Sequence, residues 1–296
     1  MTALAPGRVL VTGASGLIGR QMAAALAARG YEAVSVSRGQ GGDIRGDLLA
    51  DPEAVVRAAG AASLVHLAWH DGSGDRWNAP VNLDWVGASL RLMRAFAEAG
   101  GRRAVMVGSC AEYGWNGAGR LAETSPLTPA TLYGAAKAAT GIAARAGAGR
   151  LGLSLAWARP FFVYGPGEPR GRLLGDLIHG LAAGQEVACT DGLQRRDFLH
   201  SADVAGALVA LLASPVEGAV NIGSGRAVAL RDMIGQIAAL LGGAGRVRLG
   251  ARPRPDGDPA LIEADVTRLA EEVGFRPRFD LQAGLVDVLR AEGALR

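Results

Sequence analysis

Residues 8–19 read RVLVTGASGLIG, and this stretch decides the fold. The apolar run 8–12 suits a strand buried on both faces, and residues 17–29 have helical spacing. The glycines between them follow the pattern G-x-x-G-x-x-G. In such a turn the first glycine permits the tight bend, the second lets backbone N–H groups approach a pyrophosphate, and the third lets the helix pack on the strand. The helix N-terminus also favours phosphate charge, so the pattern predicts a dinucleotide cradle rather than an ordinary strand-to-helix turn.

The alternation of strand and helix continues along the chain. Further β-rich runs lie at 31–37, 64–68, 104–108 and 153–158, and helical stretches lie near 51–59, 79–99 and 131–148. Strands that alternate with helices in this way predict an α/β fold, a doubly wound parallel sheet of the Rossmann type, over residues 1–165.

After residue 165 the sequence becomes rich in Pro and Gly, which predicts a smaller C-terminal substrate-binding lobe over 166–296. We expect helices near 171–183, 201–213 and 229–242, with strands near 187–190 and 218–222. The strand near 218–222 is expected to return to the main sheet.

Composition excludes several classes of protein. The 296 residues carry 31 Lys plus Arg against 28 Asp plus Glu, and this small, scattered excess does not predict a nucleic-acid groove. A hydrophobic content of 49% with 20% charged residues excludes disorder. The longest apolar stretch, 204–213, is about half of a membrane span. Cys110 and Cys189 lie far apart and show no metal-ligand spacing, so we predict no metal and a cytoplasmic setting.

The end of the second strand bears on which cofactor binds. A carboxylate there selects NAD through the ribose 2′-OH, whereas an arginine can meet the 2′-phosphate of NADP. The residues present are Ser37 and Arg38, which favour NADP(H), with NAD(H) possible and a solvated loop charge as the alternative for Arg38. Asp47 is a candidate for the adenine amino group, or for capping the helix that starts near Asp51.

Tyr133 and Lys137 are four residues apart in the sequence YGAAK and would share one helix face. An ammonium beside a phenol lowers the phenol pKa, so that the tyrosine can exchange a proton with a carbonyl or alcohol oxygen. Ser109 follows the strand 104–108 at the carboxyl end of the sheet, where such folds bind ligands. These three residues form the predicted catalytic group.

The chain resembles the extended short-chain dehydrogenase/reductases of the nucleotide-sugar epimerase and dehydratase group. The matching motifs are VTGASGLIG (11–19), GDL (46–48), VHLA (65–68), GSCAEYG (108–114), YGAAK (133–137), RPFFVYGPG (159–167), RRDFLHSADVA (195–205) and VNIGSG (220–225). This resemblance implies that Ser109, Tyr133 and Lys137 are the catalytic triad and that residues 67–69 wall the nicotinamide ribose pocket. His66 and Asp203 are expected to be structural.

The glycine pattern and the resemblance together give the predicted site. The cofactor-binding residues are Gly13, Ser15, Gly16, Leu17, Ile18, Gly19, Ser37, Arg38, Asp47, Leu48, Leu67, Ala68, Trp69, Tyr133, Lys137, Pro160 and Val163. The substrate-binding residues are Ser109, Cys110, Ala111, Phe162, Arg172, Arg196 and Arg254. For Arg196 and Arg254, which resemble arginines that hold a sugar nucleotide, a surface ion pair is the alternative.

Three departures from the family pattern limit which of the family's reactions this chain is expected to catalyse. Sugar 4,6-dehydratases of this kind carry Asp-Glu after the catalytic hydroxyl residue, where this chain has Cys110-Ala111. The histidine of double epimerases aligns with Arg172. The usual asparagine before V-Y-G-P-G is Phe162, which removes a diphosphate contact, and an aromatic pocket that favours a deoxygenated sugar could compensate.

The resulting hypothesis is NADPH-dependent reduction of the 4-keto group of a nucleotide-linked 4-keto-6-deoxyhexose, with Tyr133 as proton donor. The alternatives are an NAD-dependent nucleotide-sugar 4-epimerase and a non-catalytic dinucleotide-binding protein. The expected partner is a nucleotide sugar, with no nucleic acid and no membrane. Helices 79–99 and 131–148 are apolar on more than one face, which fits either burial between sheet and lobe or a homodimer.

Overall fold

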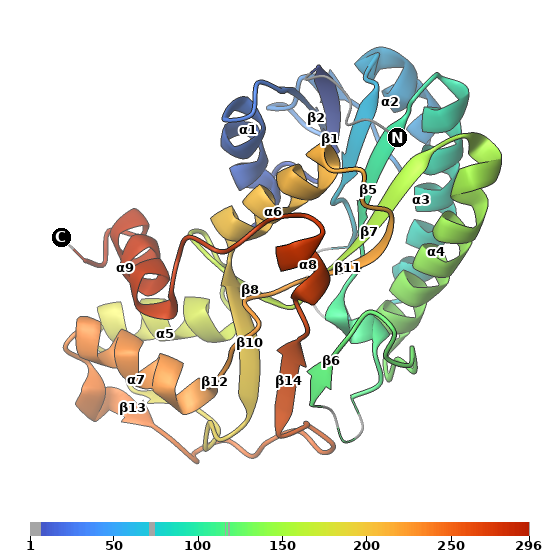
Figure 1. Ribbon diagram of the computed structural model, residues 1–296. Coiled ribbons are helices and arrows are strands. Elements are labelled where there is room, and N and C mark those ends of the chain that lie inside the picture. Colours follow the sequence, from blue (N-terminus) through green and yellow to red (C-terminus); the bar gives the residue numbers. More distant parts are fainter. Residues whose placement is uncertain (1–6, 71–74, 116, 118, 296) are drawn as a thin grey trace.

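The computed structural model describes residues 7–70, 75–115, 117 and 119–295 (Figure 1). Its larger sheet has seven strands, all paired in parallel, in the order β11-β7-β5-β4-β1-β2-β3. The strands are β1 (Arg8–Thr12), β2 (Glu32–Ser37), β3 (Ile44–Arg45), β4 (Ser63–His66), β5 (Arg103–Val107), β7 (Ser154–Pro160) and β11 (Gly218–Ile222). The predicted doubly wound parallel sheet is confirmed, and β11 returns to it beside β7.

Helices cover both faces of this sheet (Figure 1). One face packs against α1 (Gly19–Ala27), α6 (Ser201–Ala213) and the short α8 (Thr267–Glu271). The other packs against α2 (Pro52–Ala59), α3 (Val81–Glu98) and α4 (Leu132–Ala148). The strands are buried on both faces, which explains their continuous apolar runs.

The helix starts follow local capping chemistry. Asp51 accepts a hydrogen bond from the backbone N–H of Ala54 at the start of α2, and Thr131 accepts one from Gly134 at the start of α4. Asp51, rather than Asp47, therefore caps this helix, and the adenine amino group stays the predicted partner of Asp47. The Thr131 cap fixes the first turn of α4, which carries Tyr133.

The smaller lobe is built around a mixed sheet. Its strands are β12 (Ala227–Ala229), β10 (Arg195–His200), β14 (Leu261–Ala264) and β6 (Arg120–Leu121) in that order, with β8 (Phe162–Tyr164) paired to β10. Helices α5 (Leu173–Ala182), α7 (Leu230–Leu240) and α9 (Leu281–Ala291) share a separate apolar core, beside the pair β9 (Val187–Ala188) and β13 (Val247–Arg248). The chain passes between the two parts repeatedly, because β6 precedes residue 165 while α6 and β11 follow it.

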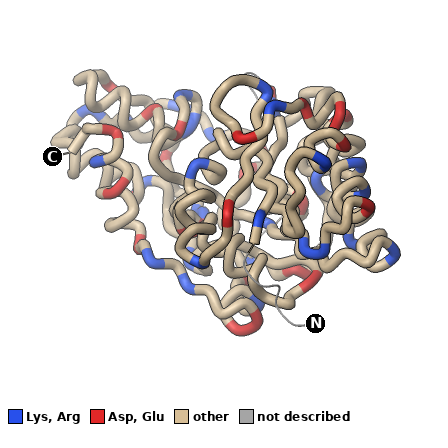
Figure 2. The backbone as a smooth tube through the Cα atoms, turned by 90° about the horizontal axis from the view of Figure 1, so that it is seen from above, with Lys and Arg blue, Asp and Glu red and all other residues tan. Residues whose placement is uncertain are grey.

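Charges of both signs are interspersed over the molecule (Figure 2). Within the described ranges, no helix is long and apolar enough to cross a bilayer. The same part of the chain contains no group of three or more His, Cys, Asp or Glu side chains placed to hold a metal ion.

Candidate active site

A cleft of about 1000 Å³ lies at the carboxyl ends of the large sheet and extends to the small lobe. This is where open α/β sheets bind ligands. All seventeen predicted cofactor residues line it: Gly13, Ser15, Gly16, Leu17, Ile18, Gly19, Ser37, Arg38, Asp47, Leu48, Leu67, Ala68, Trp69, Tyr133, Lys137, Pro160 and Val163. Positions spread over half the chain are therefore gathered along one surface.

The three glycines of the turn serve different steric purposes. Gly13 has φ of +71°, and a Cβ there would come within 2.7 Å of the Ala68 nitrogen. A Cβ on Gly19 would lie 2.1 Å from the Gly13 carbonyl oxygen, so only glycine allows this strand-to-helix contact. Gly16 is exposed, and a Cβ there would meet nothing closer than that oxygen at 3.4 Å. Its backbone is open to the cleft, as a bound pyrophosphate requires, and the turn fits a dinucleotide.

Tyr133 stands at the start of α4 and faces Ser109 at the end of β5. Burial raises the pKa of the Tyr133 phenol, while a hydrogen bond with the Ser109 side chain and the charge of Arg76 act to lower it. The backbone N–H of Tyr133 donates to the Trp77 carbonyl over 2.8 Å. The Ser109 hydroxyl and the Tyr133 phenol thus lie near one another on the wall of the cleft.

Lys137 lies one helical turn further along α4, and its side chain is only 3% exposed. Its ammonium donates to the Val107 carbonyl over 2.7 Å, and burial lowers its pKa to about 7. It is the single lysine of the chain, which otherwise carries thirty arginines. An arginine could not release its proton in a protein, whereas a lysine can. That the single lysine stands at this position is a sequence signal that the motif spacing did not use.

Aromatic side chains enclose the phenol, and the sequence predicted only one of them as part of the site. The Trp77 and Trp69 rings meet Tyr133 edge to face, with centroids 5.5 and 6.5 Å away, and Trp85 stacks on Trp69 at 6.0 Å. All four line the cleft. Trp77 and Trp85 follow the strand β4 in sequence, but nothing in their spacing indicates that they fold back over α4.

The substrate side of the cleft holds six of the seven predicted residues: Ser109, Cys110, Ala111, Phe162, Arg172 and Arg196. Burial raises the pKa of the Cys110 thiol to about 12, so this cysteine is a packed side chain without acid or base chemistry at neutral pH. Phe162 forms an aromatic wall with Trp115 and Phe198, at centroid distances of 6.5 and 5.8 Å.

Arg254 is placed differently from the prediction. It is not among the described residues that line the cleft, and it forms a two-pronged ion pair with Asp191 at 2.7 and 2.8 Å. The structure thus shows the ion pair that was the alternative for Arg254, and a contact of Arg254 with substrate stays a prediction. Arg196 also forms an ion pair, with Asp258, but it stays in the cleft with its guanidinium 5.6 Å from the Phe162 ring centroid.

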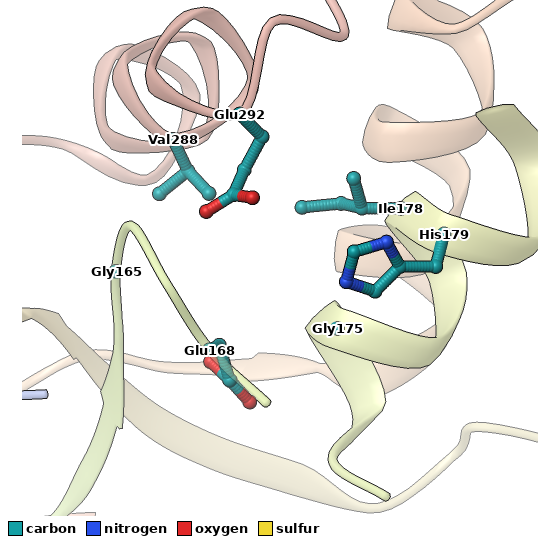
Figure 3. Close-up of a pocket in the computed structure, with 7 residues that line it drawn as sticks. All are labelled: Gly165, Glu168, Gly175, Ile178, His179, Val288 and Glu292. Carbon is teal, nitrogen blue, oxygen red and sulfur yellow. The ribbon is translucent and has the colours of Figure 1, made fainter. Parts of the chain in front are cut away.

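A partly buried carboxylate, Glu168, lines the cleft and was not predicted. It separates the cleft from a smaller pocket between the loop after β8 and helices α5 and α9, into which Ile178, His179 and Glu292 point (Figure 3). Burial raises the Glu168 pKa to about 7, and one of its oxygens has no hydrogen-bond partner among the described residues. Only the fold brings this loop residue to the cleft.

The two residues expected to be structural have structural contacts. His66 is bonded through Nδ1 to the Thr12 hydroxyl at 2.7 Å and through Nε2 to Ser89 at 2.9 Å, and burial lowers its pKa to about 3. It is therefore neutral at physiological pH. The buried Asp203 carboxylate accepts hydrogen bonds from the backbone N–H groups of Arg278 and Phe279.

Comparison with known proteins places this site in a family. Residues 9–223 match the NAD dependent epimerase/dehydratase family. A dTDP-4-dehydro-6-deoxy-D-allose reductase from a Streptomyces species is 28% identical over 95% of this chain and 95% of its own length. A UDP-glucose 4-epimerase from Corynebacterium glutamicum is 27% identical, with 97% and 96% covered. A solved structure of MoeE5 in complex with UDP-glucuronic acid and NAD is 31% identical and superimposes with a TM-score of 0.85 over 97% of this chain and 99% of that one.

The chain therefore belongs to the NAD dependent epimerase/dehydratase family, the extended short-chain dehydrogenase/reductases. It is an NAD(P)-dependent enzyme of the class that modifies nucleotide sugars.

Proposed function

We propose that the protein reduces the 4-keto group of a nucleotide-linked 4-keto-6-deoxyhexose with NADPH. The observation that carries this proposal is the meeting of the Ser109 hydroxyl, the Tyr133 phenol and the Lys137 ammonium in one cleft beside the glycine turn. The likeness to a dTDP-4-dehydro-6-deoxy-D-allose reductase over 95% of the chain supports the same reaction.

In this reaction the cofactor, when bound, supplies a hydride to the carbonyl carbon. Tyr133 donates its phenolic proton to the carbonyl oxygen, and Ser109 donates a hydrogen bond to that oxygen as negative charge develops. The Ser109 hydrogen bond and the Arg76 charge act to lower the phenol pKa, and Lys137, one helical turn away, would hold the nicotinamide ribose. The ketone thus gains a hydride and a proton and becomes an alcohol.

The substrate side of the cleft supports a reduction without elimination. Cys110 and Ala111 occupy the places where related dehydratases carry two carboxylic acids, and neither offers an acid at neutral pH. The wall of Phe162, Trp115 and Phe198 is apolar and suits a sugar carbon that has lost its hydroxyl. Arg172 and Arg196 supply positive charge for a diphosphate in the same cleft.

The cofactor preference is proposed to be NADPH. Arg38 is exposed at the end of β2 and lines the cleft, and no carboxylate follows that strand directly. A guanidinium at this position can bind a ribose 2′-phosphate.

The direct test incubates the purified protein with NADPH and a panel of 4-keto-6-deoxyhexoses linked to dTDP, CDP, GDP or UDP. We expect loss of the reduced nicotinamide absorbance, with one equivalent of 4-hydroxy sugar formed per NADPH. The absence of cofactor oxidation with every member of the panel would overturn the proposal.

An NAD-dependent 4-epimerase is the second candidate, because the epimerase from Corynebacterium glutamicum matches nearly the whole chain. The two reactions differ in the fate of the cofactor. An epimerase retains tightly held NAD and interconverts UDP-glucose and its 4-epimer without net oxidation, whereas the proposed reductase exchanges and consumes NADPH. Identifying the co-purified nucleotide therefore separates them.

We also propose that two copies associate through α3 and α4. Leu83 on α3 and Ile142 on α4 are 60% and 52% exposed, and the two helices lie side by side (Figure 1). Apolar side chains this exposed on adjacent helices favour association. Light scattering should give the mass of a dimer, and the Leu83→Glu/Ile142→Glu variant should give a monomer; a monomeric wild type would contradict this.

A further inference from the structure

Directly behind the catalytic serine lies a buried ion pair. Glu112 ends the one-turn helix that follows Ser109, and Arg159 lies on the neighbouring strand β7. Their side chains are 0% and 1% exposed, with 2.8 Å between Arg159 Nε and a Glu112 oxygen. The Glu112 carboxylate also accepts hydrogen bonds from the Trp157 indole at 2.9 and 3.1 Å. Burying such a pair gives little or no net stability compared with apolar side chains of similar size, so its presence calls for another role.

The carboxylate is tied to the catalytic serine through the backbone. Glu112 accepts a hydrogen bond from the Ser109 N–H over 2.8 Å, and the Ser109 hydroxyl accepts one from Ala111. Together these contacts form a capping box around the turn that presents Ser109. A Cβ on Gly108 would lie 2.1 Å from the Glu112 carboxylate, so the end of β5 is shaped around this group.

The same carboxylate acts on the lysine. Lys137 donates to the carbonyl of Val107, and the next residue, Gly108, faces the Glu112 carboxylate, so both side chains converge on the end of β5. Burial lowers the Lys137 pKa, and the Glu112 charge acts to raise it. The other titratable groups packed around these two residues are His66 on β4, Cys110 and Tyr113 beside Glu112, Tyr133 and Arg145 on α4, and Arg159 on β7. His66 and Cys110 are neutral at physiological pH, and Arg145 and Arg159 are positive. Glu112 is the carboxylate of this group, and Asp197 and Glu123 are the further carboxylates that act on Cys110 and on Tyr113.

We propose that Glu112 is a positioning residue of the catalytic centre, whose carboxylate fixes the Ser109 backbone and keeps the Lys137 side chain protonated. Glu112 acts through Ser109 and Lys137 and does not itself line the cleft among the described residues. Its importance for turnover rests on the function proposed above, whereas its effect on Lys137 does not.

Because Lys137 is the single lysine, its titration can be observed alone. Protein grown with isotope-labelled lysine should give one side-chain signal by NMR, which is followed against pH without cofactor or substrate. In Glu112→Gln we expect the Lys137 pKa to fall by about one unit, a tenfold loss of proton affinity. The comparison variant, Arg159→Met, keeps the carboxylate, and while Glu112 stays ionised the Lys137 pKa should be unchanged or raised.

The double variant Glu112→Gln/Arg159→Met separates this role from a purely structural one. It leaves neither charge buried without its partner, so it should fold even where a single variant does not. We expect a lowered Lys137 pKa in this variant as well, and a deficit in reduction rate that shrinks as the pH is lowered and Lys137 regains its proton. A Lys137 pKa equal to that of the wild type in the double variant would overturn the inference.

The two proposals fail in different ways. A lowered Lys137 pKa in a protein whose wild type oxidises no NADPH leaves the role of Glu112 standing and rejects the reductase. A normal Lys137 pKa in an active reductase rejects the role of Glu112 alone.

Discussion

The Lys137 ammonium lies 3.8 Å from the centroid of the Trp69 ring. Trp69 is held in place because its indole N–H donates to the Asn82 side chain over 2.8 Å, and Asn82 in turn donates to the carbonyls of Arg76 and Ala79. A buried ammonium that has lost its water is stabilised by an aromatic face. The orientation of Lys137 therefore depends on a side chain from the loop after β4.

Replacing Trp69 should reduce turnover through its effect on the protonation of Lys137. Trp69→Leu removes the aromatic face, which is worth about 0.5–2 kcal/mol, and so should reduce turnover about 2- to 30-fold at neutral pH. The Lys137 pKa should fall, because its charged form loses a stabilising contact. The matched variant Trp115→Leu removes another indole of the cleft and should leave the Lys137 titration unchanged. Equal Lys137 pKa values in the two variants would contradict this account.

The buried Lys137 should lower the free energy of unfolding by an amount that depends on pH. The folded-state pKa of about 7 lies below the ordinary lysine value of about 10.4, so the unfolded chain binds the proton more tightly. The penalty is full below pH 7 and disappears as the pH rises to about 10. At pH 6, Lys137→Met should therefore have a larger free energy of unfolding than the wild type, by a margin on the order of a few kcal/mol, and a higher melting temperature. This margin should vanish near pH 10. A margin that does not change with pH would be incompatible with this reasoning.

The glycine turn gives a prediction that separates folding from binding. In Gly16→Ala the new methyl has room within the protein but projects where the pyrophosphate is expected, so the melting temperature should be retained while cofactor affinity falls about tenfold or more. In Gly19→Ala the methyl meets the Gly13 carbonyl, so stability should fall as well. Thermal melts and fluorescence titration with NADPH measure the two effects. Unaltered NADPH affinity in Gly16→Ala would place the cofactor elsewhere.

Arg38 should decide between the two dinucleotides. A hydrogen bond to a charged group is worth about 1.5–3 kcal/mol, so Arg38→Ala should weaken NADPH binding about 10- to 150-fold and leave NADH binding unchanged. Arg45→Ala is the control, because Arg45 is also exposed, on the adjacent strand β3, but is not among the described residues of the cleft. Equal losses for both cofactors would show that Arg38 does not contact the 2′-phosphate.

The sequence was sufficient to predict the sheet and the centre of the site, because both follow from local patterns. Apolar runs such as Arg8–Thr12 alternate with helical spacing, and parallel strands then bring residues that follow different strands to one edge. The same logic predicts that Ser109 and Tyr133 meet at this edge.

Contacts between segments distant in the chain could not be predicted in this way. Arg254 has the type and neighbourhood of a ligand-binding arginine, yet Asp191 neutralises it because a separate loop brings that carboxylate within 2.7 Å. In the sequence, Glu112 is an ordinary polar residue before Tyr113. Only the folded structure, in which Arg159 of β7 lies beside it, shows that it is a buried charge. Trp77 and Glu168 reach the cleft on loops, and Trp85 on the first turns of α3, and the course of all three segments depends on tertiary packing.

The most direct test of the account compares wild-type protein with Tyr133→Phe, which removes one oxygen atom from the proposed proton donor. With NADPH and a 4-keto-6-deoxyhexose nucleotide that the wild type reduces, we predict that turnover falls about 10²- to 10⁴-fold while NADPH binding and melting temperature stay the same. Tyr31→Phe, which changes a phenol in the core of the large sheet, should behave as wild type. Reduction by Tyr133→Phe at the wild-type rate would contradict the central claim.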